Sequence, residues 1–222
     1  MARLTSLRRW TARIACGAAV IIAGVVHVPA ALAFPYRADF GSTSVLSERP
    51  IDRVAMGHVL ARAERLLAAS PLDRPGLSRQ VVLTDGGWRW QILAIGARDA
   101  IALRRPFSHA IIFNHHSVAA DQVFNGAPLG GVRTLSGTIA HETTHRLVAD
   151  HIGEWAALRL PAWKREGYPD YVAQETSIRS GDEALICKRD PNARVLAYYE
   201  GRRRVAAELA RNGGSVDALL AR

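Results

Sequence analysis

One stretch of the chain carries side chains in a pattern that suits metal chemistry: residues 141–145 read His-Glu-Thr-Thr-His. On a helix, positions i and i+4 lie one turn apart on the same face, so the imidazoles of His141 and His145 can reach one metal ion. Glu142 lies about 100° further round the helix than His141, beside the metal rather than bound to it. There its carboxylate can accept a proton from a water molecule. The motif therefore predicts a metal site with its own general base.

The residues on either side of this motif predict that its helix is buried. Apolar residues precede and follow it, among them Leu135, Ile139 and Leu147. Burying two imidazoles and a carboxylate without partners would cost roughly several kcal/mol, and a bound metal removes that cost. The alternative, a charged helix face on which two histidines coincide, does not suit this apolar setting. Zinc is the metal that we expect, because it takes imidazole and carboxylate ligands in a tetrahedron and leaves one position for water.

A catalytic zinc site needs a third protein ligand, and the first candidate is Glu166. Twenty residues separate it from His145, and it lies in the run Pro-Ala-Trp-Lys-Arg-Glu-Gly-Tyr-Pro-Asp-Tyr at 161–171. This run resembles the second half of the gluzincin metallopeptidase signature, in which a P-x-W-x-x-E-G-x-x-x-Y-like segment follows H-E-x-x-H. The resemblance is closest to the small secreted members of the peptidase-MA-like group and spans residues 134–173.

The resemblance implies a set of roles. Glu166 would be the third zinc ligand, and Asp170 would be the carboxylate that orients His141, a partner that zinc-bound histidines usually have. The fold would be α+β and zincin-like, with the H-E-x-x-H helix packed against a small mixed sheet and further helices. A looser likeness reaches the last helix, where Tyr198 would donate a hydrogen bond to the oxyanion of the reaction. Packing between helices explains Tyr198 equally well, and the same holds for Tyr199.

His151 is the alternative third ligand. Residues 141–151 match H-E-x-x-H-x-x-G-x-x-H, the metzincin pattern, except that Val148 replaces the glycine. That glycine lets the helix end abruptly, and β-branched valine is poor at the positive φ that such an ending requires. Metzincins also need a methionine downstream, whereas Met1 and Met56 lie upstream of the motif. The sequence therefore favours Glu166.

Periodicity and turn residues predict the surrounding elements. Pro169 indicates that the helix after the motif starts or kinks near Glu166, because proline is tolerated only in the first turn of a helix. The expected elements, in chain order, are an irregular lead-in (34–50), a helix (51–69), a strand (80–84), a turn (85–87), a returning strand (88–95), a third strand (109–114), a loop (126–131), the motif helix (134–148) and two further helices (near 166–179 and 193–211).

Other polar and aromatic side chains have simpler explanations. His115 and His116 follow the third strand, which resembles the edge strand that binds extended substrate in gluzincins; polar loop positions explain these histidines better. Trp88 and Trp90 alternate along the expected returning strand and are predicted to be core residues. The arginines 202–204 suggest a solvated helix face.

The composition is that of an ordinary globular protein, with 222 residues of which 49% are hydrophobic and 22% charged. These values exclude a disordered chain, a collagen-like chain and a polytopic membrane protein. The net charge is +9. Because much of this excess lies in the arginines of the N-terminal segment, we expect no nucleic-acid partner. Two cysteines, Cys16 and Cys187, are too few for a disulfide scaffold.

The first 33 residues predict a secretory signal peptide. Arginines come first, residues 14–26 are apolar and small, and Ala31-Leu32-Ala33 forms an A-x-A cleavage site. The alternative is an uncleaved membrane anchor, although the apolar run is short for a bilayer, which needs about 20 residues. Residues 34–222 then form one peptidase-MA-like domain, and we expect it to be periplasmic or secreted.

The leading hypothesis is an exported zinc metallopeptidase. It would hydrolyse peptide or protein substrates by attack of a zinc-bound water that Glu142 activates, with zinc held by His141, His145 and Glu166. Two rival hypotheses are a catalytically silent binding domain with the same fold and a zinc hydrolase that acts on something other than a peptide.

The export hypothesis has a direct test. Expressed in a Gram-negative host, the protein should be recovered outside the cytoplasm, and N-terminal sequencing should find Phe34 first. A membrane-bound product that still begins with Met1 would instead support the anchor.

Overall fold

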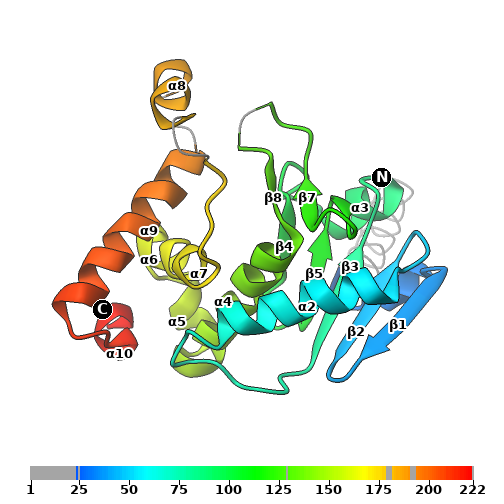
Figure 1. Ribbon diagram of the computed structural model, residues 1–222, viewed down its shortest axis with the longest axis horizontal. Coiled ribbons are helices and arrows are strands. Elements are labelled where there is room, and N and C mark those ends of the chain that lie inside the picture. The colour runs from blue at the N-terminus through cyan, green and yellow to red at the C-terminus, as the bar shows by residue number, and fades with distance from the viewer. Residues whose placement is uncertain (1–23, 25, 129, 179–181, 191–193, 222) are drawn as a thin grey trace, which may run out of the picture.

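Five strands form the main sheet of the computed structural model, which describes residues 24, 26–128, 130–178, 182–190 and 194–221 (Figure 1). The order across the sheet is β1-β2-β3-β5-β4. Strands β2, β3 and β5 run parallel, and β1 and β4 are antiparallel edge strands. The expectation of an α+β fold with a small mixed sheet is therefore confirmed. The five strands are β1 (Tyr36–Phe40), β2 (Thr43–Ser47), β3 (Arg79–Leu83), β4 (Ala102–Arg104) and β5 (Ala110–Phe113).

The predicted signal peptide falls largely outside the described residues. Of residues 1–33, the structure describes 24 and 26–33, including the short 3₁₀ helix η1 (Pro29–Leu32). Among the helices that the structure describes, none combines the length and apolar character needed to cross a bilayer.

Residues 34–50 are not the irregular lead-in that the sequence suggested. They form the hairpin of β1 and β2, whose turn includes Gly41 at φ +57°. A two-residue turn of Gly41 and Ser42 between aromatic and β-branched positions is a hairpin signal. The prediction of an irregular segment was therefore wrong.

The predicted strand at 88–95 is also wrong, because these residues form helix α3 (Trp88–Leu93). Trp90, Leu93 and Ala94 are buried, which is the spacing of one helix face rather than of alternating strand positions. Trp88 is 55% exposed, so only Trp90 is a core residue as predicted. The predicted strands at 80–84 and 109–114 correspond to β3 and β5.

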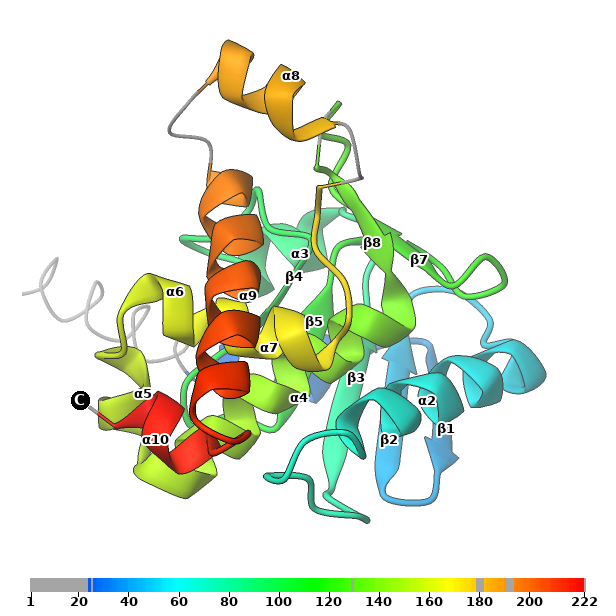
Figure 2. The same ribbon diagram turned by 60° about the vertical axis from the view of Figure 1, so that its left-hand side comes forward.

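Two long helices cover one face of the sheet, and α3 covers the other (Figures 1 and 2). The two are α2 (Arg53–Leu67) and α4 (Leu135–Ile152), which confirm the helices predicted at 51–69 and 134–148. Val81 and Leu83 of β3 face them, while Val82 faces α3. This alternation is what a strand buried on both faces requires.

A small second sheet leads the chain into α4. Its antiparallel strands are β6 (His115–Ser117), β7 (Gln122–Phe124) and β8 (Val132–Thr134), and α4 begins directly after β8. The predicted loop at 126–131 connects β7 and β8 in the part of it that the structure describes.

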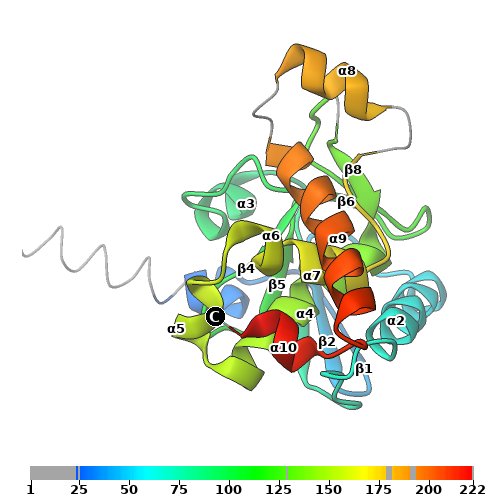
Figure 3. The same ribbon diagram turned by 90° about the vertical axis from the view of Figure 1, so that its left-hand side faces the viewer.

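Helices from the C-terminal third pack against the other side of α4 (Figure 3). The helix predicted near 166–179 is shorter and broken at Glu166, with Pro169 in the first turn after the break. Arg179 itself lies outside the described residues. The helices on this side of α4 are α5 (Glu154–Leu158), α6 (Ala162–Arg165), α7 (Gly167–Val172), α9 (Arg194–Arg211) and α10 (Val216–Leu220). Helix α8 (Asp182–Arg189) packs against the start of α9 instead.

Two glycines allow α7 and α9 to cross closely. A Cβ at Gly167 would overlap the backbone of Gly201, and a Cβ at Gly201 would press on the backbone of Trp163. Larger residues here would force the two helices apart. Gly167 directly follows Glu166, so this close crossing fixes the segment that carries the third predicted ligand.

Candidate metal centre

Helix α4 is held in place by polar groups gathered at its first turn. Thr134 is the N-cap, and its hydroxyl accepts a hydrogen bond from the backbone N–H of Gly137 at 3.0 Å. Asp121 accepts from the backbone N–H of Ser136 at 2.8 Å, and Glu175 accepts from that of Thr134 at 2.7 Å. Carboxylates satisfy free N–H groups here and suit the positive end of the helix dipole. A Cβ at Gly137 would overlap the carboxylate of Glu175 and the hydroxyl of Thr134, so a larger residue here would displace two of these capping groups.

The three predicted ligand side chains converge beside α4, one to two turns beyond its first turn. His141 and His145 lie on this helix, and Glu166 lies between α6 and α7. The Nε2 atoms of His141 and His145 are 3.1 Å apart, and Oε2 of Glu166 lies 3.8 Å from the first and 3.4 Å from the second. A tetrahedral zinc ion with bonds of about 2.0–2.1 Å sets its ligand atoms about 3.3 Å apart. The three side chains therefore have the chemistry and spacing of a zinc ligand set.

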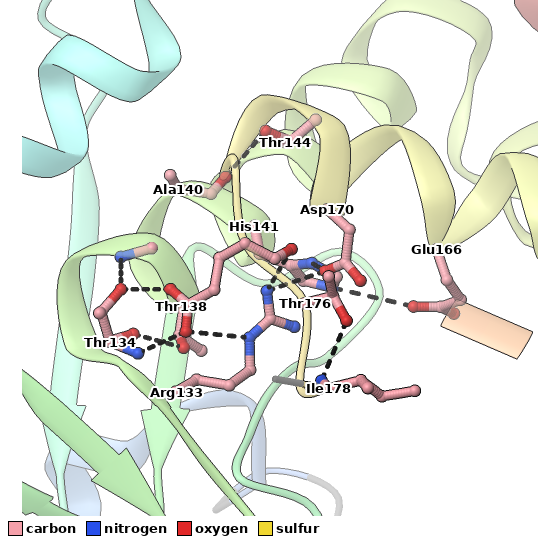
Figure 4. Close-up of polar contacts among 12 residues, drawn as sticks. Arg133, Thr134, Thr138, Ala140, His141, Thr144, Glu166, Asp170, Thr176 and Ile178 are labelled. Carbon is pink, nitrogen blue, oxygen red and sulfur yellow. Dashed lines mark hydrogen bonds and ion pairs between the residues drawn. The ribbon is translucent and has the colours of Figure 1, made fainter. Parts of the chain in front are cut away.

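A buried chain of charges fixes the orientation of His141 (Figure 4). Its Nδ1 lies 2.7 Å from Oδ1 of Asp170, which also accepts a hydrogen bond from Nη2 of Arg133 at 2.8 Å. Asp170 is 0% exposed and Arg133 6%. Burial alone would raise the pKa of Asp170, but the charge of Arg133 and the contact with His141 hold it below its usual value. The ionised carboxylate keeps the Nδ1 proton of His141 in place and leaves Nε2 as a lone pair for the metal.

Glu166 is ionised by its surroundings. Burial acts to raise its pKa, but the hydrogen bond to His145 and the charges of His145 and His141 bring it far below the usual value. Burial likewise acts to lower the pKa of His145, and the carboxylates of Glu166 and Glu142 raise it. Nε of Arg165 donates to Oε1 of Glu166 at 3.1 Å, so Oε2 is the oxygen that points to the histidines. Without a metal, these groups compensate one another as an ionic cluster.

Glu142 lies beside this ligand set without belonging to it. Its residue is 8% exposed, and its charge is close enough to His145 to raise the pKa of that imidazole. This is the position that the motif predicts for a general base.

The competing ligand, His151, lies elsewhere. It follows His145 by six residues on a continuous helix, which is a rise of about 9 Å. Its Nε2 contacts Oδ1 of Asp217 on α10 at 2.6 Å. Helix α4 turns at Gly153, φ +88°, two residues after His151, so the chain does not fold back at Val148 as a metzincin site would need.

Tyr198 lies half-buried in the second turn of α9. Positions three apart share a helix face, so Tyr198 is on the same side of α9 as Gly201, which touches the backbone of Trp163 and Gly167. This face is therefore turned toward the segment around Glu166. Its role as oxyanion donor stays a prediction.

His115 and His116 lie in strand β6, so the prediction that they are polar loop residues was wrong. His115 stacks on Phe124, and the Nδ1 atom of His116 donates to the carbonyl of Thr84 at 2.9 Å. Burial lowers the pKa of His116. The third predicted strand, β5, lies inside the sheet, so it is not an edge; the edge beside α4 is β4.

Sequence reasoning missed the residues that support the ligands: Arg133, Glu175, Asp121 and Arg165. Arg133 and Asp170 are 37 positions apart, and no local pattern marks either Arg133 or Glu175. Asp170 was found only through the gluzincin resemblance. Comparison with protein-family models, with curated proteins and with solved structures finds no match to this chain.

The geometry predicts how two variants will differ. Glu166→Ala removes one of three converging donors and should reduce the zinc content after dialysis sharply. His151→Ala removes an imidazole that contacts Asp217 instead, and zinc content should stay near that of the wild type. Elemental analysis of both proteins checks this, with circular dichroism as the control for folding. The reverse ranking would assign the third ligand to His151.

Proposed function

We propose that this protein is a zinc metallopeptidase of gluzincin type with a zincin-like fold. One observation carries the proposal: His141, His145 and Glu166 converge within a few ångströms, and a buried carboxylate holds the opposite nitrogen of His141. An accidental pair of surface histidines would not have this buried support. The arrangement of a mixed sheet, a motif helix behind its edge and a ligand-bearing segment after that helix supports the zincin-like assignment.

The chain supplies each group that peptide hydrolysis needs. His141, His145 and Glu166 would hold zinc, which supplies Lewis acidity toward a carbonyl oxygen and lowers the pKa of water when it is bound. Glu142 accepts the proton of the attacking water and passes a proton to the leaving amine. Tyr198, on the face of α9 turned to this region, donates a hydrogen bond to the oxyanion.

The sheet edge beside α4 favours a peptide over another substrate. Among the strands that the structure describes, β4 pairs with β5 alone, and α4 contacts it. A terminal strand offers backbone N–H and C=O groups to an extended chain, which binds as one more strand. We place the substrate backbone along β4, with its scissile bond toward the histidines. The predicted signal peptide places this activity in the periplasm or outside the cell.

Glu142→Gln separates catalysis from metal binding. Because Glu142 is not among the converging ligands, the variant should keep its zinc and its fold, while loss of the general base should lower the rate about 10²- to 10⁴-fold. Zinc content and cleavage of a broad peptide library should be measured side by side. Glu208→Gln, which alters an exposed pair with Arg211 on α9, is the matched control and should keep full activity.

Two results would contradict the proposal. Unchanged activity in zinc-loaded Glu142→Gln would place the chemistry elsewhere. A zinc-loaded wild type that cleaves no peptide would support the silent binding domain or a different hydrolase.

A further inference from the structure

A small cavity adjoins the candidate metal centre. Its volume is about 40 Å³, and His145 forms part of its wall. Since one water molecule needs about 10–15 Å³ of such space, the cavity has room for about three atoms of water size, which is the size of a carboxylate group. Its other walls come mainly from β4, α5 and α6, so it lies between the sheet edge at β4 and the segment that carries Glu166.

Arg104 is a buried charged residue in the wall of this cavity. Its side chain is only 9% exposed, and its Nη2 lies 2.6 Å from Oε1 of Glu154. Glu154 is fixed in turn, because it also accepts the backbone N–H of Phe107 at 3.2 Å. The Nε atom of Arg104 is buried without a hydrogen-bond partner. Its Nη1 donates to the carbonyls of Arg105 and Ser108 at 3.3 and 3.4 Å, so Nε is the donor of this guanidinium that has no acceptor, and such a donor is costly to bury.

Cations outnumber anions around the cavity. Lys164 and Arg165 stand on its α6 side. Arg104 is paired with Glu154 and Arg165 with Glu166, whereas Lys164 donates to the neutral carbonyl of Ala221 at 2.6 Å, so its charge is the one in this wall that no carboxylate balances among the described residues. Aliphatic side chains of α4 and α5 line the remainder, which lowers the local dielectric and strengthens any charge interaction. A neutral polar side chain would leave the charge of Lys164 unbalanced, whereas a carboxylate would compensate it.

We propose that this cavity is a substrate subsite that takes a carboxylate, with Arg104 and Lys164 as its specificity-determining residues. The inference rests on the proposed function, since it names the class of peptide that the site prefers. The carboxylate belongs either to an acidic side chain next to the scissile bond or to the C-terminus of the substrate, and the two sources share one chemistry. Arg104 lies on β4, along which the substrate backbone would run, so a side chain or chain end leaving that strand can reach it.

A binding experiment tests the subsite independently of turnover. Zinc-loaded Glu142→Gln protein is titrated with short alanine-based peptides, blocked at both ends, that carry Glu or Gln at each position in turn. A second set compares free-acid with amidated C-termini. We expect an acid to bind about ten- to a hundredfold more tightly than its amide counterpart in one of the two sets, the range typical of charged hydrogen bonds. The set that shows the preference identifies the source of the carboxylate.

Variants of the cavity residues then show whether these residues cause the preference for an acid over its amide counterpart. Arg104→Gln combined with Glu154→Gln removes the buried pair without changing the net charge or leaving one partner alone. In this double variant the affinities for acid and amide peptides should differ by no more than about threefold. Lys164→Gln should reduce the preference severalfold. Arg37→Gln removes an exposed charge on β1, at the opposite edge of the sheet, and should leave it unchanged.

The outcomes separate the subsite from the catalytic proposal. Equal binding of acids and amides in both peptide sets, or a preference that survives in both cavity variants, would overturn the subsite. A preference that disappears in these variants upholds it, even if the wild type cleaves no peptide. The same titration with metal-free protein covers the case in which zinc does not bind, because Arg104 and Lys164 remain in place.

Discussion

The hydrogen-bonded chain from Arg133 through Asp170 to His141 is the constraint on which the rest of the site depends (Figure 4). It joins β8, α7 and α4 inside the protein, where no water can replace a missing partner. Buried pairs of this kind contribute little net stability, but removing one partner costs about 3–5 kcal/mol because the other charge is left uncompensated. The chain thus acts mainly by selecting one geometry, in which His141 holds its proton on Nδ1 and turns Nε2 toward the other two proposed ligands.

The remaining structure supplies that chain with rigid surroundings. Capping groups fix the start of α4, the sheet and α2 pack against one side of it, and the C-terminal helices pack against the other. Two threonine hydroxyls on α4 are satisfied within the helix: Thr138 donates to the carbonyl of Thr134 at 2.7 Å, and Thr144 donates to that of Ala140 at 2.8 Å. The crossing at Gly167 and Gly201 then holds the segment that carries Glu166 close against α9. The ligands of a metal must be held to within about half an ångström of their positions, so a metal site here requires such support.

The parts of this account that the sequence could predict are those with local signals. The His-Glu-Thr-Thr-His spacing, the long helices and the central strands follow from periodicity within a few turns. The hairpin of β1 and β2 was missed although Gly41 marks its turn. Helix α3 was taken for a strand because Trp88 and Trp90 alternate, and the segment is too short to distinguish the period of a strand from that of a helix. Arg133 and Glu175 were beyond sequence reasoning, since each acts on residues about forty positions away and only the fold brings them together. Asp170 was named only because a resemblance supplied it.

The central claim, that Asp170 fixes His141 so that its Nε2 binds the metal, can be tested in the wild-type protein. Histidine nitrogens are labelled with ¹⁵N, and the protein is loaded with ¹¹³Cd as a substitute for zinc. The nitrogen chemical shifts and the metal–nitrogen couplings then report the tautomer of each imidazole directly. The account predicts coupling of the metal to Nε2 of His141 and of His145, and a proton on Nδ1 of His141. Coupling of the metal to Nδ1 of His141, or to His151, would contradict it.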